Sequence, residues 1–167
     1  MEQTELQNEL AELNAPDDDV RRDPVGARKK AMDLLARREQ TRGELITKLV
    51  KARFAVDIAE DVVSQLGTEG LQSDQRFAEA FVQSRYRSGK GPARVRAELR
   101  GKSVPDALID SALSDFDGNW YALAVDVRAK KFGTAPASDF KEKARQMRFL
   151  QYRGFESDHI AVACGED

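Results

Sequence analysis

The chain has 167 residues, of which 34% are charged, and it contains one cysteine, Cys164, and one histidine, His159. These counts exclude a disulfide framework and a cysteine–histidine zinc site. No run of 18 apolar residues occurs, and no basic segment followed by an apolar stretch opens the chain. We therefore expect a soluble protein of the reducing cytoplasm that makes no use of a membrane.

Charge is distributed unevenly along the sequence. Residues 1–24 hold eight acidic residues and two arginines, and the remaining chain holds 25 basic and 21 acidic residues, a net charge of +4. We interpret residues 1–24 as an acidic flexible arm, with a short helix over Glu2–Leu13 that Pro16 ends. An acidic arm on a basic body indicates an anionic partner with which the arm competes. A merely solubilising tail is the alternative, and composition favours neither.

Residues 25–70 predict a first three-helix repeat. Helical spacing places the apolar residues on one face of a first and a third helix: Ala27, Ala31, Leu34 and Leu35; then Ile58, Val62, Val63 and Leu66. Between them, Thr41 and Glu44 have the spacing of a capping box, and Leu45 and Leu49 follow. Gly67 is the expected C-terminal cap of the third helix.

Residues 71–117 predict a second repeat. Ser73 is the expected cap of a helix whose inner face is Phe77, Ala80, Phe81 and Ser84. Pro92 fits the first turn of the next helix, which carries Val95 and Leu99. Val104-Pro105 ends it, and a third apolar stripe follows: Leu108, Ile109, Ala112 and Leu113.

Residues 118–167 predict a third repeat. It comprises a helix from Trp120 to Lys131, a second helix with Phe140, Ala144, Met147 and Leu150 on its inner side, and a last helix capped by Ser157. Thr41 corresponds to Gly91 and Phe54 to Phe155, so the period is about 45–50 residues. No convincing two-residue alternation of β-branched residues occurs. The fold class predicted is all-α, with three tandem three-helix (helix-turn-helix-like) repeats in an elongated, curved array.

No catalytic group, metal site or cofactor is expected. His159 and Cys164 each stand without a nucleophile or base at a recognisable spacing, so we interpret His159 as a surface or half-buried imidazole and Cys164 as a small apolar filler. Gly89-Lys90-Gly91 lacks the spacing of a nucleotide-binding loop.

Basic clusters are the strongest functional pattern. Seven cations and one acid, Glu98, lie between residues 85 and 102, whereas a solvated helix usually intersperses the two signs. A second cluster lies in the last repeat. The candidate partner- or DNA-binding residues are Arg85, Arg87, Lys90, Arg94, Arg96, Arg100, Lys102, Lys130, Lys131, Arg145, Arg148 and Arg153. Tyr86 either stacks on a base or packs beneath the turn, and packing is favoured.

Four segments resemble the RecX family of regulatory proteins: Ser73–Ala78, Ser84–Leu99, Lys130–Gly133 and Arg148–Phe155. The resemblance covers about residues 25–164. It departs from the family pattern at Arg53, where the family commonly has glycine, so we expect a less tight turn there. A second departure is Gln72-Ser73-Asp74, where Leu-Asp-Asp is typical.

The resemblance implies an all-α monomer that binds the RecA–DNA nucleoprotein filament in its helical groove. It also implies inhibition of strand exchange, ATP hydrolysis and co-protease activity. The residues themselves leave a second interpretation open, in which the helices bind single- or double-stranded DNA directly without sequence preference.

Overall fold

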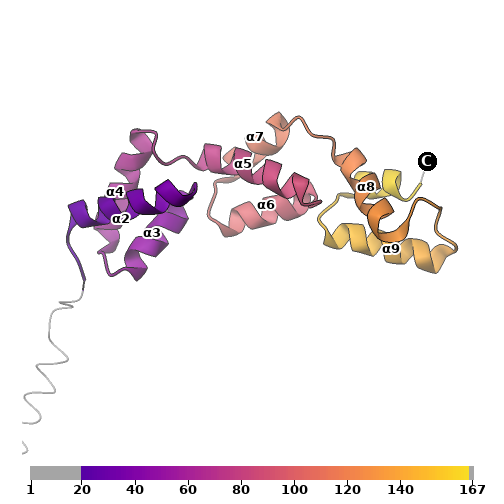
Figure 1. Ribbon diagram of the computed structural model, residues 1–167, viewed down its shortest axis with the longest axis horizontal. Helices are drawn as coiled ribbons and strands as arrows, with labels where there is room; N and C mark the ends of the chain where they lie inside the picture. The colour runs from indigo at the N-terminus through magenta and orange to yellow at the C-terminus, as the bar shows by residue number, and fades with distance from the viewer. Residues whose placement is uncertain (1–19, 166–167) are drawn as a thin grey trace, which may run out of the picture.

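The computed structural model describes residues 20–165, and every regular element in that range is an α-helix (Figure 1). The helices form three groups in chain order. The first group is α2 (Pro24–Arg37), α3 (Arg42–Lys51) and α4 (Val56–Thr68). The second is α5 (Asp74–Arg87), α6 (Pro92–Gly101) and α7 (Asp106–Asp115). The third is α8 (Trp120–Phe132), α9 (Phe140–Tyr152) and α10 (Ser157–Ala163).

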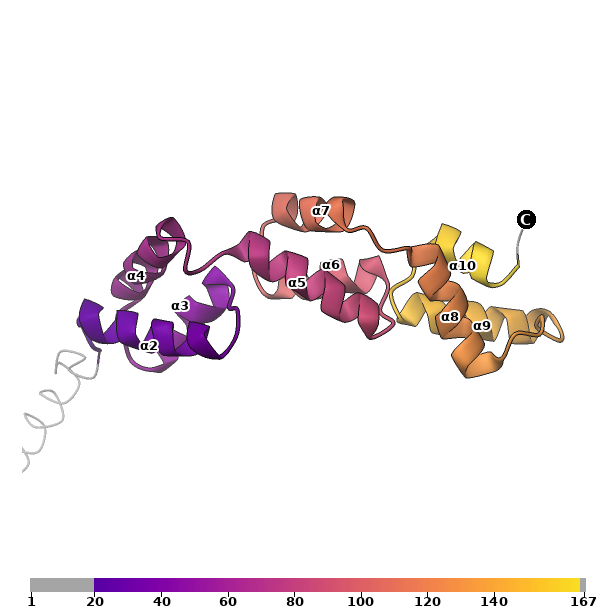
Figure 2. The same cartoon turned by 45° about the horizontal axis from the view of Figure 1, so that its top comes forward.

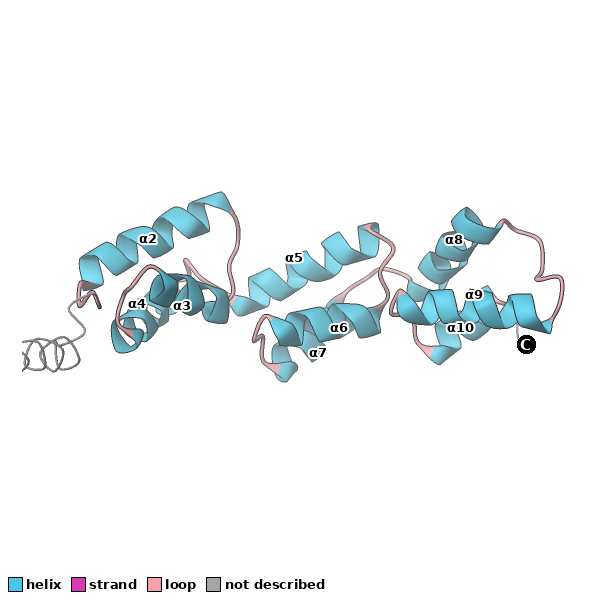
Figure 3. Ribbon diagram, turned by 90° about the horizontal axis from the view of Figure 1, so that it is seen from below, coloured by secondary structure: helices cyan, strands magenta, loops and turns pink. Residues whose placement is uncertain are grey.

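The three groups lie in one elongated, shallowly arched row (Figures 1 and 2), and loops connect each group to the next (Figure 3). Each group encloses its own hydrophobic core. Leu45, Leu49 and Leu66 are completely buried in the first core, Leu99 and Ile109 in the second. Leu150 and Phe155 belong to the third core. The prediction of an all-α fold built from three-helix units is confirmed, and none of the described helices is long and apolar enough to cross a membrane.

The helix ends follow from local sequence. The Thr41 side chain accepts the Glu44 backbone N–H, and the Glu44 carboxylate accepts the Thr41 N–H, which completes the predicted capping box. Pro92 occupies the first turn of α6, where its missing N–H leaves no intrahelical bond unmade. Ser73 caps α5 by accepting the Arg76 N–H.

One turn recurs after the second helix of every group and sets the period. Phe54, Val104 and Phe155 each donate a backbone N–H to the residue five positions earlier, and all three bonds measure 3.1 Å. The residue before each donor has a positive φ: Arg53 at 71°, Ser103 at 64° and Gly154 at 96°. The expectation of a less tight turn at Arg53 is therefore wrong, since an arginine adopts the left-handed conformation there and the same hydrogen bond closes the turn.

The inner faces of α5 and α9 differ in part from the prediction. On α5 the buried residues are Phe77, Ala78 and Val82, whereas Ala80 and Ser84 are exposed. Phe77 and Phe81 pack in the second core as predicted. Small residues fit either side of a helix, so spacing alone did not place Ala80 and Ser84. Phe140 is 86% exposed, because the inner face of α9 is formed by Gln146 and Leu150.

Two helix ends also lie elsewhere than predicted. Helix α4 continues past Gly67, and Gly70, with φ of 76°, turns the chain so that the Leu71 N–H bonds to the Leu66 carbonyl. Helix α10 is capped by Glu156, one residue before Ser157.

The N-terminal boundary of the fold lies before Pro24. Asp23 caps α2 by accepting the Gly26 N–H, and Arg21 pairs with Phe54 in an isolated parallel bridge. The end of the predicted acidic arm is thus part of the first group. The helix predicted over Glu2–Leu13 lies outside the described residues.

Candidate nucleic-acid and partner interface

The junctions between groups position the candidate residues, and both junctions use the same two elements. At each, the N-terminus of the second helix of one group meets the turn after the second helix of the next. The Thr41 hydroxyl donates to the Lys102 carbonyl at 3.0 Å. The Gly91 N–H donates to the Arg153 carbonyl at 2.8 Å, and the Ala93 N–H to the Gly154 carbonyl at 3.0 Å.

The second junction is a backbone-to-backbone contact. A Cβ atom added at Gly91 would lie 2.3 Å from the Gly154 carbonyl carbon, and one added at Gly154 would lie 2.3 Å from the Arg94 Cβ. Glycine at both positions allows this approach. The approach brings the turn after α5 next to α8 and to the C-terminal end of α9.

Half of the twelve candidate cations form ion pairs within the fold. Arg85 and Arg94 both face Glu98, Arg96 faces Asp110 and Arg100 faces Asp106; Lys102 reaches Glu44 of the first group, and Arg145 forms two hydrogen bonds with Glu142. Glu98 and Glu142 lie on the same helices as Arg94 and Arg145. Asp110, Asp106 and Glu44 lie outside residues 85–102, which explains why that segment looks unbalanced by itself. Each of these cations is already partly neutralised.

The other half form no ion pair with any residue between 20 and 165. These cations are Arg87, Lys90, Lys130, Lys131, Arg148 and Arg153. All except Arg148 lie at the junction of the second and third groups. Burial lowers the pKa of Lys90 below its ordinary value, and the positive charges of Arg153 and Arg94 lower it further. Lys90, Arg153 and Arg94 therefore lie close enough for their like charges to interact.

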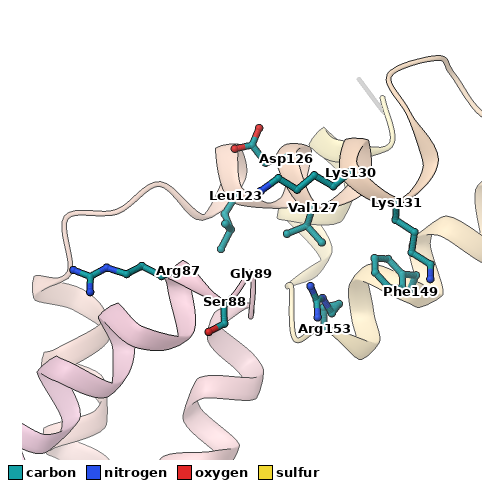
Figure 4. Close-up of a pocket in the computed structure, with 10 residues that line it drawn as sticks. All are labelled: Arg87, Ser88, Gly89, Leu123, Asp126, Val127, Lys130, Lys131, Phe149 and Arg153. Carbon is teal, nitrogen blue, oxygen red and sulfur yellow. The ribbon is translucent and has the colours of Figure 1, made fainter.

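A groove of about 420 Å³ lies at this junction, and we call it the junction groove (Figure 4). Its residues come from the turn after α5, from one side of α8 and from the end of α9. They are Arg87, Ser88, Gly89, Leu123, Asp126, Val127, Lys130, Lys131, Phe149 and Arg153. Four are cationic, one is acidic and three are large and apolar, so the groove offers positive charge beside an apolar wall.

Two of these cations lie over the ring of Phe149. The Lys131 Nζ lies 4.7 Å and the Arg153 Cζ 5.7 Å from the centre of the Phe149 ring. Cation–π attraction holds charged groups in place without neutralising them. Figure 4 shows Arg153 pointing into the groove from the α9 side. Its Nε is fully buried and has no hydrogen-bond partner among the described residues.

Tyr86 packs beneath the turn, as favoured from the sequence. Its ring lies 5.0 Å from that of Phe116 and 5.2 Å from that of Trp120. Its hydroxyl donates to the Asn119 carbonyl at 3.1 Å and accepts the Asn119 N–H. Tyr86 therefore ties α5 to the start of α8 and is not available to stack on a base.

The remaining candidate groups have local structural roles. His159 is buried, at 5% exposure, because Tyr121 and Phe155 pack edge-on against its ring; the prediction of a surface or half-buried imidazole is wrong. Its Nδ1 accepts the Glu156 N–H at 3.2 Å. Asp158 lies close enough to complete a three-residue cluster of metal-binding type, but its carboxylate accepts the Tyr121 hydroxyl. Cys164 packs half-buried against the third core, as expected for an apolar filler.

Three models of RecX three-helix domains match the chain. The first domain matches residues 27–66, the second residues 73–113 and the third residues 118–163. The chain belongs to the RecX family. Among curated relatives, it is 43% identical to the regulatory protein RecX of Halorhodospira halophila over 84% of this chain and 89% of that protein. It is 44% identical to RecX of Acinetobacter baylyi over 81% and 84%.

Solved RecX structures have the same fold. The crystal structure of RecX from Lactobacillus salivarius superimposes with a TM-score of 0.74 at 21% identity, covering 86% of this chain and 95% of that one. A second RecX crystal structure superimposes with a TM-score of 0.73, and the match covers 86% of this chain and 72% of that one.

Sequence reasoning missed part of the junction groove. Leu123, Val127 and Phe149 line it, yet the sequence marks them only as core-type residues of two helices. Leu123 and Phe149 are half-buried and Val127 is buried, and their place at the groove depends on the approach of Gly91 to Gly154. The two glycines in Gly89-Lys90-Gly91 were the available signal, because close backbone contacts require glycine.

Proposed function

We propose that this protein binds the RecA–DNA nucleoprotein filament in the cytoplasm and inhibits recombinase, ATPase and co-protease activity. The observation that carries the proposal is the match of three successive RecX domains along the described chain. Its curated relatives are called regulatory proteins, which supports a regulator without catalytic chemistry of its own.

An elongated row of domains suits a partner that is itself a repeating polymer. Each group presents a different segment of one continuous surface, so one monomer can contact several neighbouring subunits along the filament groove. Contacts that are individually weak then combine, because binding by one group raises the effective concentration of the others. The proposal therefore requires all three groups for strong inhibition.

Deleting the third group tests this requirement. We would remove residues 122–167 and keep Trp120, because its ring packs against the second core. Inhibition of RecA strand exchange should fall far more than in a variant with one altered charge, Arg100→Gln. Far-ultraviolet circular dichroism would check that the first two groups remain helical. Equal inhibition by the shortened and full-length proteins, at equal concentration, would refute the spanning arrangement.

Direct, sequence-nonspecific binding to nucleic acid is the second candidate function, and the unpaired cations at the second junction favour it. Filter binding of DNA at two salt concentrations, with and without RecA, distinguishes the two candidate functions. Tight binding to naked DNA that RecA leaves unchanged would favour the second function. Binding that requires RecA would favour the first.

A further inference from the structure

The two junctions share their architecture but differ in charge. In the repeat register that aligns Thr41 with Gly91, Glu39 aligns with Gly89. At the first junction, Glu39 pairs through both carboxylate oxygens with Arg76 of the next group. At the second junction, glycine leaves that position without a carboxylate. One junction is thus closed by an ion pair, whereas the other leaves Arg87, Lys130, Lys131 and Arg153 without an ion pair among the described residues.

Gly89 also keeps the junction groove open. Its φ is +75°, and a Cβ there would lie 3.0 Å from the Val127 side chain and 3.2 Å from an Arg153 guanidinium nitrogen. Any larger residue would enter the space in front of Arg153. The conformation and the space together account for glycine at this position.

The groove concentrates positive charge that the fold does not use. Arg87, Lys130 and Lys131 line it without an ion pair, and Asp126, its one carboxylate, forms none with the described residues. The Arg153 Nε–H is buried and lacks an acceptor among the described residues, so the fold does not neutralise this guanidinium. An anion in the groove would meet the part of Arg153 that lines it, through a charge-assisted contact.

The apolar residues of the groove indicate which class of anion would fit it. Leu123, Val127 and Phe149 lie beside the cations in the same groove. A single nucleic-acid strand carries one phosphate per unit, with sugar and base flanking each charge, and such strands bind where cations adjoin apolar or aromatic side chains. An acidic peptide supplies the charge, but it does not attach a ring to every charged unit.

We propose that the junction groove binds the phosphodiester backbone of single-stranded DNA through Arg87, Lys130, Lys131 and Arg153. The inference deepens the proposed function and rests on it, because it names the surface of the protein that meets the DNA of the filament. The six ion-paired cations of the basic clusters contribute little to this contact.

The test compares two triple variants that remove the same charge. The groove variant carries Arg87→Gln, Lys130→Gln and Lys131→Gln, and the control variant carries Arg96→Gln, Arg100→Gln and Arg145→Gln. Binding of a fluorescent oligo(dT) strand would be followed by anisotropy at several salt concentrations, with circular dichroism to verify helicity. Each phosphate contact to a single strand contributes about 0.7 to the salt slope. The groove variant should lose about 2 from that slope and bind about tenfold more weakly, while the control keeps the wild-type slope.

Several outcomes would overturn the proposal: equal losses in both variants, an unchanged groove variant, or no binding of oligo(dT) by the wild type. Equal displacement of the strand by polyglutamate would also overturn it in favour of an acidic peptide. Parallel measurement of RecA strand exchange separates this proposal from the proposed function. If the groove variant binds DNA as tightly as the wild type, the proposal that the groove binds DNA is wrong, even if the wild type inhibits RecA. Loss of DNA binding in that variant supports the groove even if RecA is unaffected.

Discussion

Replacing Gly91 with alanine should separate the second and third groups without unfolding either. The added Cβ would lie 2.3 Å from the Gly154 carbonyl carbon and 2.4 Å from the Phe155 nitrogen, whereas ordinary contacts begin near 3.4 Å. All the nearest atoms belong to backbone, so the two elements must move apart by about 1 Å. A shift of that size breaks the Gly91–Arg153 and Ala93–Gly154 hydrogen bonds.

The cost can be estimated from these bonds. Each hydrogen bond contributes about 1 kcal/mol net, so the junction should lose about 2 kcal/mol. The Ala93 amide lies in the first turn of α6, where the helix supplies no acceptor, and its acceptor is the Gly154 carbonyl. Hydrogen exchange at Ala93 therefore reports the junction alone, and protection there should fall about 30-fold.

Amide hydrogen exchange followed by NMR provides the measurement. The Leu99 amide, inside α6, should keep its protection because the second core is not altered. Gly101→Ala is the matched control, since nothing lies within 4 Å of a Cβ at that position. Wild-type protection at Ala93 in the Gly91→Ala protein would refute the argument that the glycine contact holds the junction.

Three further predictions concern stability and inhibition. Leu99→Ala should cost about 2–5 kcal/mol in urea unfolding, because Leu99 is completely buried, and Phe81→Ala, at a half-buried site, should cost less; equal costs would contradict the assigned core. Burial opposes ionisation of Glu44, yet hydrogen bonds from Lys102 and the Thr41 N–H hold the pKa of that carboxyl below its ordinary value. The Glu44 carboxylate therefore stabilises the folded protein above about pH 4.3, the ordinary glutamate pKa. This stabilisation is lost as the pH falls through the lower pKa of the folded state. Glu44→Gln should flatten the fall in melting temperature over that acid range, and an unchanged profile would contradict the pairing. Gly89→Glu should weaken oligo(dT) binding measured by anisotropy, because it places a carboxylate beside Arg153; unchanged affinity would contradict an accessible cationic groove.

Local chemistry explains which elements were predictable. The Thr41 capping box, Pro92 at the start of α6 and the stripes of α2 and α4 depend on neighbours within a few residues, and the structure has them as expected. The inner face of α9 was readable only in part: Leu150 and Met147 pack in the third core as predicted. Gln146 was missed, because its side-chain oxygen accepts a hydrogen bond from the buried Arg128. A buried polar pair of this kind is invisible to hydrophobic spacing.

The candidate site was predictable only in part for a similar reason. The sequence identified the cations but not their partners: Arg96 pairs with Asp110 of the next helix, and Lys102 pairs with Glu44 of another group, which is 58 residues away. Ion pairing separates the twelve candidates into neutralised and unpaired sets. It depends on how the helices pack within a group and, for Lys102, on how the groups dock. Docking in turn depends on backbone contacts such as Gly91 with Gly154, which leave no periodic pattern.

The central claim is that this row of RecX domains acts on RecA. The most direct test is the rate of RecA-catalysed ATP hydrolysis on single-stranded DNA while this protein is titrated into the reaction. We predict that the rate falls progressively as the protein is added and reaches a low plateau. A rate that stays constant up to a large molar excess over RecA would contradict the claim.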